Sequence, residues 1–309
     1  MASDPIAEPV PAGLRDAILE WYASSARPLA FRRTTDPYAI LVSEAMAQQT
    51  QAARAAAYWE RFMVRFPTVQ ALAAATPADV LREWQGLGYD RRALALWRTA
   101  RVIVDTHDGR VPETVEELQA LPGVGPYTAR AVAALAFGLP VGAVDVNVRR
   151  VLGRIVAGSP EALSPVEMQA LADASVPLDR PGAWTHALMD IGATLCRPRE
   201  PRCDACPAKE SCRYTADAAR TTGLEPRPRT RSRPRQPAVP FNTTNRWLRG
   251  RILDRLRLAP DGEWVVLAEA VGSHELDRVH AAAHALARDG VIELDALDDA
   301  HPRARLALG

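Results

Sequence analysis

Apolar side chains recur every three or four positions through residues 13–194, a period that is typical of α-helices with one buried face. In the first such segment, Leu14 and Ile18 fall on the same side. Thr76 followed by Pro77 marks another helix start, because threonine caps a helix N-terminus and proline suits its first turn. Since strand patterns are scarce, we predict an all-α region with a helix pair within 37–62 and further helices over 13–25, 77–84, 90–106, 113–121, 125–137, 144–157, 164–174 and 183–194.

The pattern changes after residue 215. Residues 225–240 hold five arginines that alternate with proline, threonine and serine, and they contain few apolar residues. We interpret residues 216–243 as an Arg/Pro-rich linker, because proline-rich chains stay extended. Such a linker is either a solvated tether or a tether that also lies along the phosphates of a nucleic acid.

Residues 244–309 have the pattern of a separate small domain. Two helical patterns, over 246–258 and 276–289, precede two short strand-like segments, 291–294 and 304–307. Helices followed by a β-hairpin predict a winged-helix-like C-terminal domain.

Length and charge narrow the possible classes of protein. A chain of 309 residues with 48% apolar residues is long enough for two domains and a small third. The net charge is only +1, so a nucleic-acid-binding surface must be a local patch. Residues 1–14 lack the apolar segment of a signal peptide, and no apolar run reaches the ~20 residues of a membrane span. We therefore expect a cytoplasmic protein with no membrane partner.

All four cysteines lie in one short segment, with the spacing C-x6-C-x2-C-x5-C. A disulfide framework is normally spread through a small secreted domain, and a structural zinc site usually has two tight cysteine pairs. Here only one tight pair exists, and thiolates also suit iron–sulfur clusters. The spacing favours one structural [4Fe–4S] cluster, and clustering disfavours the alternative of four unrelated thiols. The expected ligands are Cys196, Cys203, Cys206 and Cys212.

A glycine-rich turn, Leu-Pro-Gly-Val-Gly at 121–125, separates two predicted helices. Gly123 and Gly125 allow a tight turn whose backbone N–H groups, together with the dipole of the second helix, can hold a phosphate oxygen. Asp145 follows in a largely apolar stretch. A lone aspartate there is usually a helix N-cap, but the turn and the cysteine segment in the same order favour a catalytic carboxylate.

These motifs resemble those of a known superfamily. The turn, the stretch V-D-V-N-V-R-R-V at 144–151 and the cysteine spacing look like the helix-hairpin-helix DNA glycosylases, which include endonuclease III. S-E-A-M-A-Q-Q-T-Q at 43–51 and W-Q-G-L-G-Y at 84–89 closely resemble signatures of the MutY branch, the adenine glycosylases.

The resemblance covers residues 14–215 and implies a two-lobed catalytic region within residues 1–215. The six-helix lobe is expected near residues 35–140, and the iron–sulfur lobe is expected to combine 1–34 with 141–215. The implied activity is base-excision repair of double-stranded DNA that holds a mismatched or damaged base pair. A monomer would remove adenine mispaired with 8-oxoguanine or guanine by hydrolysing the N-glycosidic bond.

Hydrolysis of an N-glycosidic bond needs a proton for the leaving base and stabilisation of a cationic sugar. Two carboxyl groups in different environments supply both. By resemblance Glu44 is the acid, and its apolar neighbours should raise its pKa by desolvation; the alternative is a solvent-facing helix charge. Asp145 is expected to stay ionised beside the sugar as nucleophile or electrostatic stabiliser, and Asn147 belongs to the same catalytic motif.

Glycosylases that also cleave the DNA strand use a lysine amine. The position after the turn that carries this lysine in such relatives is Tyr127 here, and Lys209, the only lysine, lies in the cysteine segment. The resemblance therefore implies a monofunctional enzyme, and we hypothesise that Tyr127 contacts Asp145 or the sugar.

The resemblance also assigns residues that contact DNA. Tyr89 is expected to intercalate beside the base opposite the adenine, although an aromatic residue after a glycine turn is also a common core residue. Other residues at the disrupted base pair are Gln48, Gln49, Thr50 and Leu87. Near the adenine pocket we expect Arg27, Phe31, Arg32 and His186.

Several residues depart from the MutY pattern, namely Phe31, Ala47, Asp90 and His186, and residues 244–309 are too short for the Nudix-like domain of many members. Two other functions therefore stay open. One is a glycosylase for thymine or uracil opposite guanine. The other is a non-catalytic damage-binding protein, which would need neither Glu44 nor Asp145.

Overall fold

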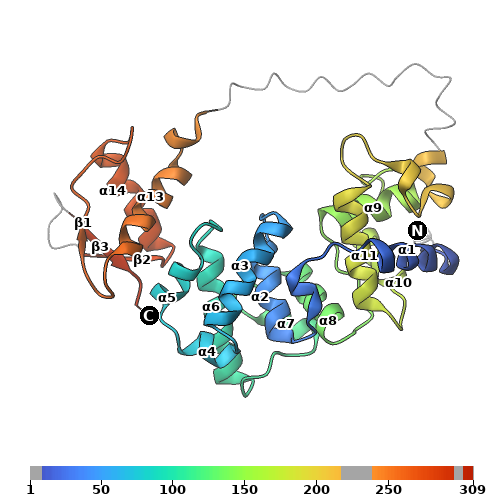
Figure 1. Cartoon of the computed structure of the whole chain (residues 1–309), viewed down its shortest axis with the longest axis horizontal. Coiled ribbons are helices and arrows are strands. Elements are labelled where there is room, and N and C mark those ends of the chain that lie inside the picture. Colours follow the sequence, from blue (N-terminus) through green and yellow to red (C-terminus); the bar gives the residue numbers. More distant parts are fainter. Residues whose placement is uncertain (1–8, 217–238, 296–301, 309) are drawn as a thin grey trace, which may run out of the picture. The chain divides into compact units, whose positions relative to one another are not determined.

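The computed structural model describes residues 9–216, 239–295 and 302–308. These residues are mostly helical, with a small sheet near the C-terminus (Figure 1). The α-helices are α1 (Ala12–Ser25), α2 (Pro37–Ala47), α3 (Ala52–Arg65), α4 (Val69–Ala74), α5 (Pro77–Glu83), α6 (Arg91–Thr106), α7 (Val115–Ala120), α8 (Pro126–Ala136), α9 (Val146–Ala157), α10 (Pro165–Ala174), α11 (Pro181–Thr194), α13 (Asn245–Leu258) and α14 (Leu276–Arg288). Short 3₁₀ turns are η1 (Ala30–Arg33), η2 (Cys203–Ala205), η3 (Lys209–Ser211) and η4 (Phe241–Thr243). The predicted all-α class is confirmed.

The predicted helix starts depend on caps that the structure shows directly. Thr76 caps α5, and its side chain and that of Asp79 form a capping box. The short helix α4, which Thr68 caps, was not predicted from the sequence. Most of the predicted Arg/Pro-rich linker, residues 217–238, lies outside the described residues.

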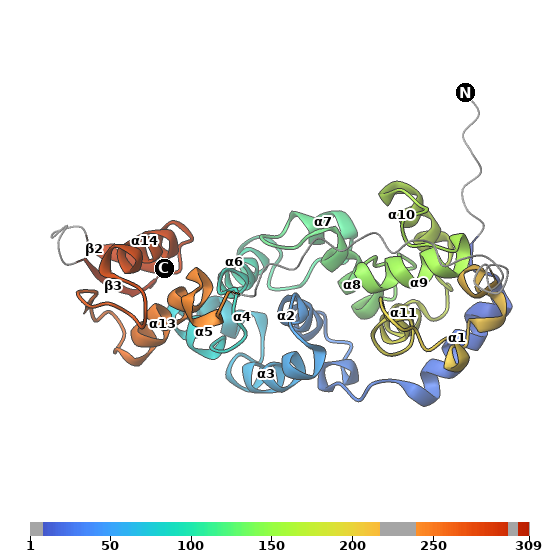
Figure 2. The same cartoon turned by 90° about the horizontal axis from the view of Figure 1, so that it is seen from above.

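The chain forms two compact units and crosses between them several times, first within α2. The first unit spans residues 1–44, 112–120 and 124–229. In it, α11 packs against α1, α8 and α9, and Figure 2 shows these helices side by side. Its core is made of fully buried side chains that include Ile18, Leu152, Leu171, Trp184 and Ile191.

The second unit spans residues 45–111, 121–123 and 230–309. Helices α4 and α5 pack against α6 in it. The aromatic rings of Phe62, Phe66 and Trp84 meet edge to face, with centroids 4.9 Å and 6.1 Å from that of Phe62. All three are buried, so they fix the base of the segment that follows α5.

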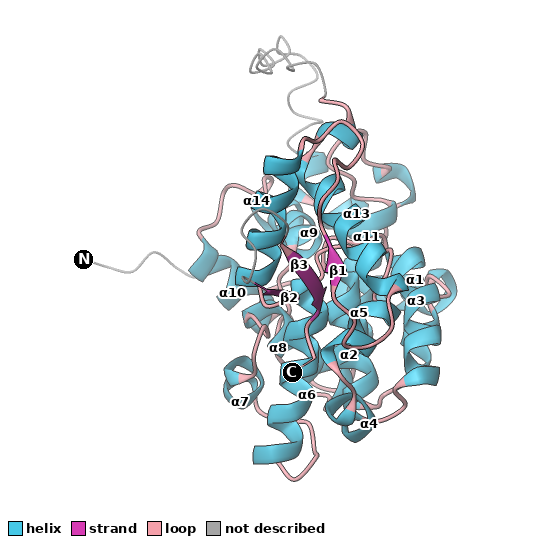
Figure 3. Ribbon diagram, turned by 90° about the vertical axis from the view of Figure 1, so that its left-hand side faces the viewer, coloured by secondary structure: helices cyan, strands magenta, loops and turns pink. Residues whose placement is uncertain are grey.

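The C-terminal elements belong to this second unit. Helix α13 packs against α14, and three short strands form an antiparallel sheet in the order β1-β3-β2 (Figure 3). The strands are β1 (Val265–Val266), β2 (Ile292–Asp295) and β3 (Arg303–Leu306). The last two match the predicted hairpin within one residue, whereas β1 was not predicted. The winged-helix-like assignment and the domain boundaries stay predictions.

Among the described helices, none combines the length and the apolar character needed to cross a membrane.

Candidate active site

Glu44 is a buried carboxyl group near the C-terminal end of α2. The residue is only 8% exposed, so the alternative of a solvent-facing helix charge is wrong. Burial raises the pKa of Glu44 to about 7; a hydrogen bond from Tyr127 and the charge of Arg32 oppose this shift, and the charge of Asp145 adds to it. A carboxyl group with this pKa keeps its proton in about half of the molecules at pH 7. It can therefore act as an acid near neutrality.

Tyr127 lies in the first turn of α8, which begins with Pro126 after Gly125. Burial raises the pKa of the Tyr127 hydroxyl well above its ordinary value, and the charges of Glu44 and Asp145 raise it further. The hydroxyl therefore keeps its proton and forms a hydrogen bond with Glu44. Sequence reasoning missed this partner, and the hypothesis that Tyr127 contacts Asp145 or the sugar stays a prediction.

Asp145 is the N-cap of α9. Its Oδ1 accepts hydrogen bonds from the backbone N–H groups of Asn147 at 2.9 Å and Val148 at 2.7 Å. Its Oδ2 accepts a third from Nδ2 of Asn147 at 2.9 Å. The structural and the chemical interpretations of Asp145 are thus compatible, because capping occupies one oxygen and leaves the second with a single donor.

The amide of Asn147 is itself held from the other side. Its Oδ1 accepts a hydrogen bond from Arg150 at 2.8 Å, and Arg150 also donates to the carbonyls of Gly192 at 2.7 Å and Cys196 at 2.6 Å. Helix α11 approaches closely here, since a Cβ placed on Gly192 would lie 2.6 Å from that of Asn147. A continuous chain of hydrogen bonds therefore joins Asp145 to the first cysteine.

A second carboxylate, Asp190 on α11, pairs with two arginines that precede α2. Arg27 binds Oδ1 at 2.5 Å, and Arg32 binds both oxygens at 2.6 Å and 2.7 Å. Burial alone would raise the pKa of Asp190, but the hydrogen bonds and charges of the two arginines hold it below its ordinary value. Asp190 is fully buried, so the ion pairs fix the position of η1.

His186 lies one helical turn from Asp190 on α11. Burial and the positive charges of Arg32 and Arg27 lower the pKa of His186 to about 3, and the opposing charge of Asp190 does not compensate. The imidazole is therefore neutral at physiological pH and offers one donor and one acceptor. Its ring lies beside that of Tyr22, with the centroids 6.3 Å apart. The nearby η1 carries Phe31, a partly buried side chain.

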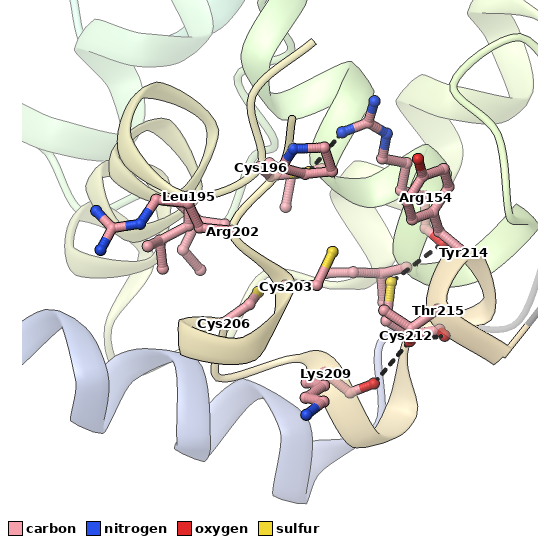
Figure 4. A pocket seen from close by; sticks show the side chains of 14 residues that line it. Arg154, Leu195, Cys196, Arg202, Cys203, Cys206, Lys209, Cys212, Tyr214 and Thr215 are labelled. Carbon is pink, nitrogen blue, oxygen red and sulfur yellow. Dashed lines mark hydrogen bonds between the residues drawn. The ribbon is translucent and has the colours of Figure 1, made fainter. Parts of the chain in front are cut away.

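The four cysteines line one cavity in the first unit (Figure 4). Helices α9 and α11 supply its apolar wall through Val151, Ile155 and Ile191. Burial raises the pKa of the Cys206 thiol to about 11, so a cationic group is needed to make it a thiolate at neutral pH. Among the described residues, no three potential ligands are gathered closely enough for a single metal ion.

Thiols placed around a shared cavity suit a group with several metal atoms, because each thiolate then binds a different one. Arg154 on α9 supports this arrangement. It donates to Cys196 Sγ at 3.4 Å and to the carbonyl of Arg197 at 2.8 Å, and its own carbonyl accepts from Cys212. The residues present therefore fit the iron–sulfur cluster expected from the spacing.

The two glycines of the turn before α8 differ in their surroundings. Gly123 has φ +75, and a Cβ there would lie 2.6 Å from that of Ala95, so no other residue fits without a shift. Gly125 has an extended backbone conformation, and no atom beyond its two chain neighbours lies within 4 Å of a Cβ placed on it. Its position at the N-cap of α8 thus leaves the backbone open to close approach.

In the second unit, Arg92 joins the two segments that were predicted to meet the disrupted base pair. From α6 it donates to the carbonyl of Gln48, to that of Leu87 at 3.4 Å and to the hydroxyl of Thr50 at 3.4 Å. Gln49 and Tyr89 both have a backbone φ above +50°, a conformation that residues other than glycine rarely adopt. Since Tyr89 is 46% exposed, the alternative that it is a core residue is wrong.

Comparison with known proteins identifies the family. Residues 42–175 match the HhH-GPD superfamily base excision DNA repair proteins. Over 246 residues, or 78% of each chain, the protein is 43% identical to adenine DNA glycosylase of Mycobacterium tuberculosis. The chain belongs to the adenine DNA glycosylase family. The human member of this family is 42% identical over 211 residues, which are 64% of this chain and 39% of the human one.

Solved structures place this family member in the helix-hairpin-helix glycosylase fold. A thermostable thymine-DNA glycosylase is 31% identical, with a TM-score of 0.63 over 66% of this chain and 96% of that one. Endonuclease III trapped with DNA shares the fold at 24% identity and a TM-score of 0.58, over 67% of this chain and 96% of that one. The predicted fold is therefore confirmed.

Sequence reasoning on this adenine DNA glycosylase family member missed the residues that hold the site together. Their common feature is a charged side chain with partners distant in sequence, a relationship that no local pattern displays. These residues are Arg92, Arg150, Arg154 and Asp190.

Proposed function

We propose that the chain is a monofunctional adenine DNA N-glycosylase of base-excision repair, which hydrolyses the bond between adenine and deoxyribose when adenine is mispaired with 8-oxoguanine or guanine. The observation that carries the proposal is that two carboxyl groups of the first unit lie in different environments. Glu44 is buried with a pKa of about 7, and Asp145 is held by three hydrogen-bond donors.

Glu44 supplies the proton. When the glycosidic bond breaks, its electron pair goes to the adenine, and a ring nitrogen that takes a proton makes adenine a better leaving group. Because the pKa of Glu44 is about 7, the protonated acid is available at neutral pH. The Tyr127 hydroxyl donates to the same carboxyl group and so orients it.

Asp145 stabilises the sugar. The departure of adenine leaves a positive charge over C1′ and the ring oxygen, and the Oδ2 of Asp145 serves as nucleophile or electrostatic stabiliser of this charge. Asn147 fixes the orientation of this oxygen. Water completes the hydrolysis by adding hydroxide to C1′ and leaving its second proton with a carboxylate, so that an abasic site remains.

Strand cleavage is not part of the proposed activity. A lyase step needs an amine that forms a Schiff base, and Tyr127 stands at the position after the turn. Lys209, the only lysine of the sequence, lines the cysteine cavity and pairs with Asp204 at 3.0 Å.

The other assigned residues bind the substrate, which is double-stranded DNA with a mismatched or damaged base pair. The target adenine must leave the base stack before its bond can be reached. The open backbone at Gly125 accepts a phosphate, and Tyr89 enters the stack beside the opposite base. Gln48, Gln49, Thr50 and Leu87 line the disrupted pair, and Arg27, Phe31, Arg32 and neutral His186 surround the extruded adenine.

The four cysteines are the proposed ligands of a [4Fe–4S] cluster. Its contribution is structural, since bonds to four thiolates fix the segment from Cys196 to Cys212 in one conformation. Arg197, Arg199 and Arg202 of this segment, and Arg213 directly after it, then present positive charge for the DNA backbone.

Single-turnover base release tests the proposal. The duplexes carry adenine opposite 8-oxoguanine, adenine opposite guanine, and thymine or uracil opposite guanine, each scored with and without alkali. Release of adenine that yields strand breaks only after alkali supports a monofunctional adenine glycosylase. Strand breaks without alkali would contradict the lyase assignment.

The same panel tests two other functions. The structural likeness to a thymine-DNA glycosylase at 31% identity favours thymine opposite guanine as the second candidate substrate. Release of thymine or uracil, with adenine untouched, would establish that alternative. Tight binding with no base release from any duplex would instead indicate a damage-binding protein.

A further inference from the structure

The C-terminal domain contacts the loop formed by residues 84–90, which we call the Tyr89 loop. Arg257 of α13 is 6% exposed at its side chain, and it donates to Asp90 at 2.5 Å and to the carbonyl of Leu81 at 3.1 Å. The same helix accepts a hydrogen bond from Gln85 at 3.1 Å on its Asp254 side chain. The ion pair between Arg257 and Asp90 is largely buried, so it holds α13 against the Tyr89 loop more firmly than an exposed ion pair would.

Helix α5, which ends just before the loop, also contacts the C-terminal domain. Arg82 donates to the side chain of Asp261 at 2.5 Å and to the carbonyls of Ala259 at 3.1 Å and Arg257 at 3.3 Å. The two carbonyls lie at the C-terminal end of α13, so the Arg82 side chain caps this helix. The C-terminal domain thus binds both the helix and the loop that position Tyr89.

Arg246, in the first turn of α13, reaches Tyr89 itself. Its guanidinium lies over the Tyr89 ring at 4.6 Å from the centroid and donates to the ring hydroxyl at 3.4 Å. The guanidinium of Arg92 lies 5.5 Å from the same centroid. The ring is therefore held by two cations, although it is 46% exposed and its backbone has φ +53.

A core aromatic ring needs no such support, whereas a ring that must enter a base stack has to keep its orientation while exposed. Arginine planes and aromatic rings also both stack on nucleobases. We propose that Arg246 is a positioning residue for mismatch recognition, which holds Tyr89 ready to stack beside the base opposite the target adenine. Through it, the C-terminal domain forms part of the DNA-reading surface. This inference rests on the proposed function and specifies which residues read the opposite base.

The test uses the full-length chain and two readouts. The first is the single-turnover rate of adenine release opposite 8-oxoguanine and opposite guanine. The second is the fluorescence of a 2-aminopurine placed next to the mismatch, which rises when the base stack opens. Arg246→Ala removes the guanidinium, and Arg246→Lys keeps the charge without the flat group. Arg255→Ala is the matched control, because Arg255 is an exposed arginine of α13 that faces Glu269.

We expect Arg246→Ala to weaken the fluorescence rise and to lower the preference for 8-oxoguanine by about threefold to tenfold, the size of a cation–π contact. Arg246→Lys should recover part of the loss, and Arg255→Ala should match wild type. Since Arg246 acts through Tyr89, Arg246→Ala should cause no further loss of either readout when Tyr89 is already replaced by alanine.

Equal behaviour of Arg246→Ala and Arg255→Ala would overturn the inference. A loss caused by Arg246→Ala in the Tyr89→Ala variant would overturn it as well. If the wild type opens the base stack but releases no adenine, the proposed function is wrong while the inference about Arg246 still holds.

Discussion

Asn147 donates a hydrogen bond from Nδ2 to Oδ2 of Asp145 across 2.9 Å. This is the only side-chain donor to Asp145 recorded among the described residues, since the other two bonds come from backbone N–H groups. Arg150 holds the amide of Asn147 from the opposite side at 2.8 Å. The orientation of the proposed sugar-stabilising oxygen therefore depends on one side-chain amide.

Removal of that amide should slow chemistry more than binding. A hydrogen bond to a charged group contributes about 1.5–3 kcal/mol, so we expect Asn147→Ala to lower the single-turnover rate by roughly tenfold to a hundredfold. The Cβ that packs against Gly192 is kept, so the fold should survive. Base release is measured with enzyme in excess over duplex. A wild-type rate in this variant would contradict the role of Asn147.

Adenine release should depend on the protonation of Glu44. Because its pKa is about 7, we expect the single-turnover rate to fall about tenfold per pH unit above that value, as the acid loses its proton. Glu44→Gln should remove most activity and the pH dependence of what remains. A rate that rises through pH 7 to 9 would show that Glu44 does not act as the acid.

The same pKa predicts a change in stability. The pKa of Glu44 is about 7 in the folded protein against an ordinary value of 4.5, so the folded state binds more protons between these values. Folding stability from this group is therefore lost as the pH rises from about 4.5 to 7. Glu44→Gln removes the cost, and we expect its unfolding midpoint to exceed that of wild type at pH 8 but not at pH 4. Equal shifts of the unfolding midpoint at both pH values would contradict the raised pKa of a buried Glu44.

Asp190 should matter for stability far more than an exposed carboxylate. Its loss leaves Arg27 and Arg32 without the carboxylate that each of them binds, and breaking a buried pair costs about 3–5 kcal/mol. Asp16→Ala is the matched control, because Asp16 is 68% exposed and its pair with Arg180 contributes about 1 kcal/mol or less. Denaturant unfolding measures both. Similar losses in Asp190→Ala and the control would show that the arginine pairing does not stabilise the fold.

Arg154 should affect the occupancy of the cysteine cavity. Arg154→Met removes the hydrogen bonds to Cys196 Sγ and to the carbonyl of Arg197, so we expect less iron and sulfide per chain after purification. Arg213→Met is the control, since Arg213 directly follows Cys212 but donates to the carbonyl of Val156. Iron content equal to that of wild type in Arg154→Met would contradict this role.

The helices were predictable because each displays its own period or cap. Thr76 with Pro77 marked the start of α5, and the apolar positions of residues 13–25 marked α1. Helix α4 was not predicted although Thr68 caps it in the structure, and strand β1, with two residues, is too short to show an alternating pattern. Their presence depends on packing against distant segments.

The candidate site was predictable only as far as contiguous motifs reach. Glu44 and Asp145 stand in motifs, whereas the partner of Tyr127 depended on how α2 and α8 meet. The contacts between Arg246 and the Tyr89 loop join residues more than 150 positions apart, and nothing in either segment indicates the other.

The most direct test of the account is adenine release by Asp145→Asn. Asparagine also caps helices, so this variant should keep the N-terminus of α9, fold normally and bind duplex DNA. Asp179→Asn, a change to an exposed carboxylate of the same unit, serves as the control. We predict that under single turnover, with adenine opposite 8-oxoguanine, Asp145→Asn loses adenine release while its affinity for the duplex and the activity of the control stay at wild-type levels. Adenine release by Asp145→Asn at the wild-type rate would contradict the assignment of Asp145, and with it the proposed mechanism.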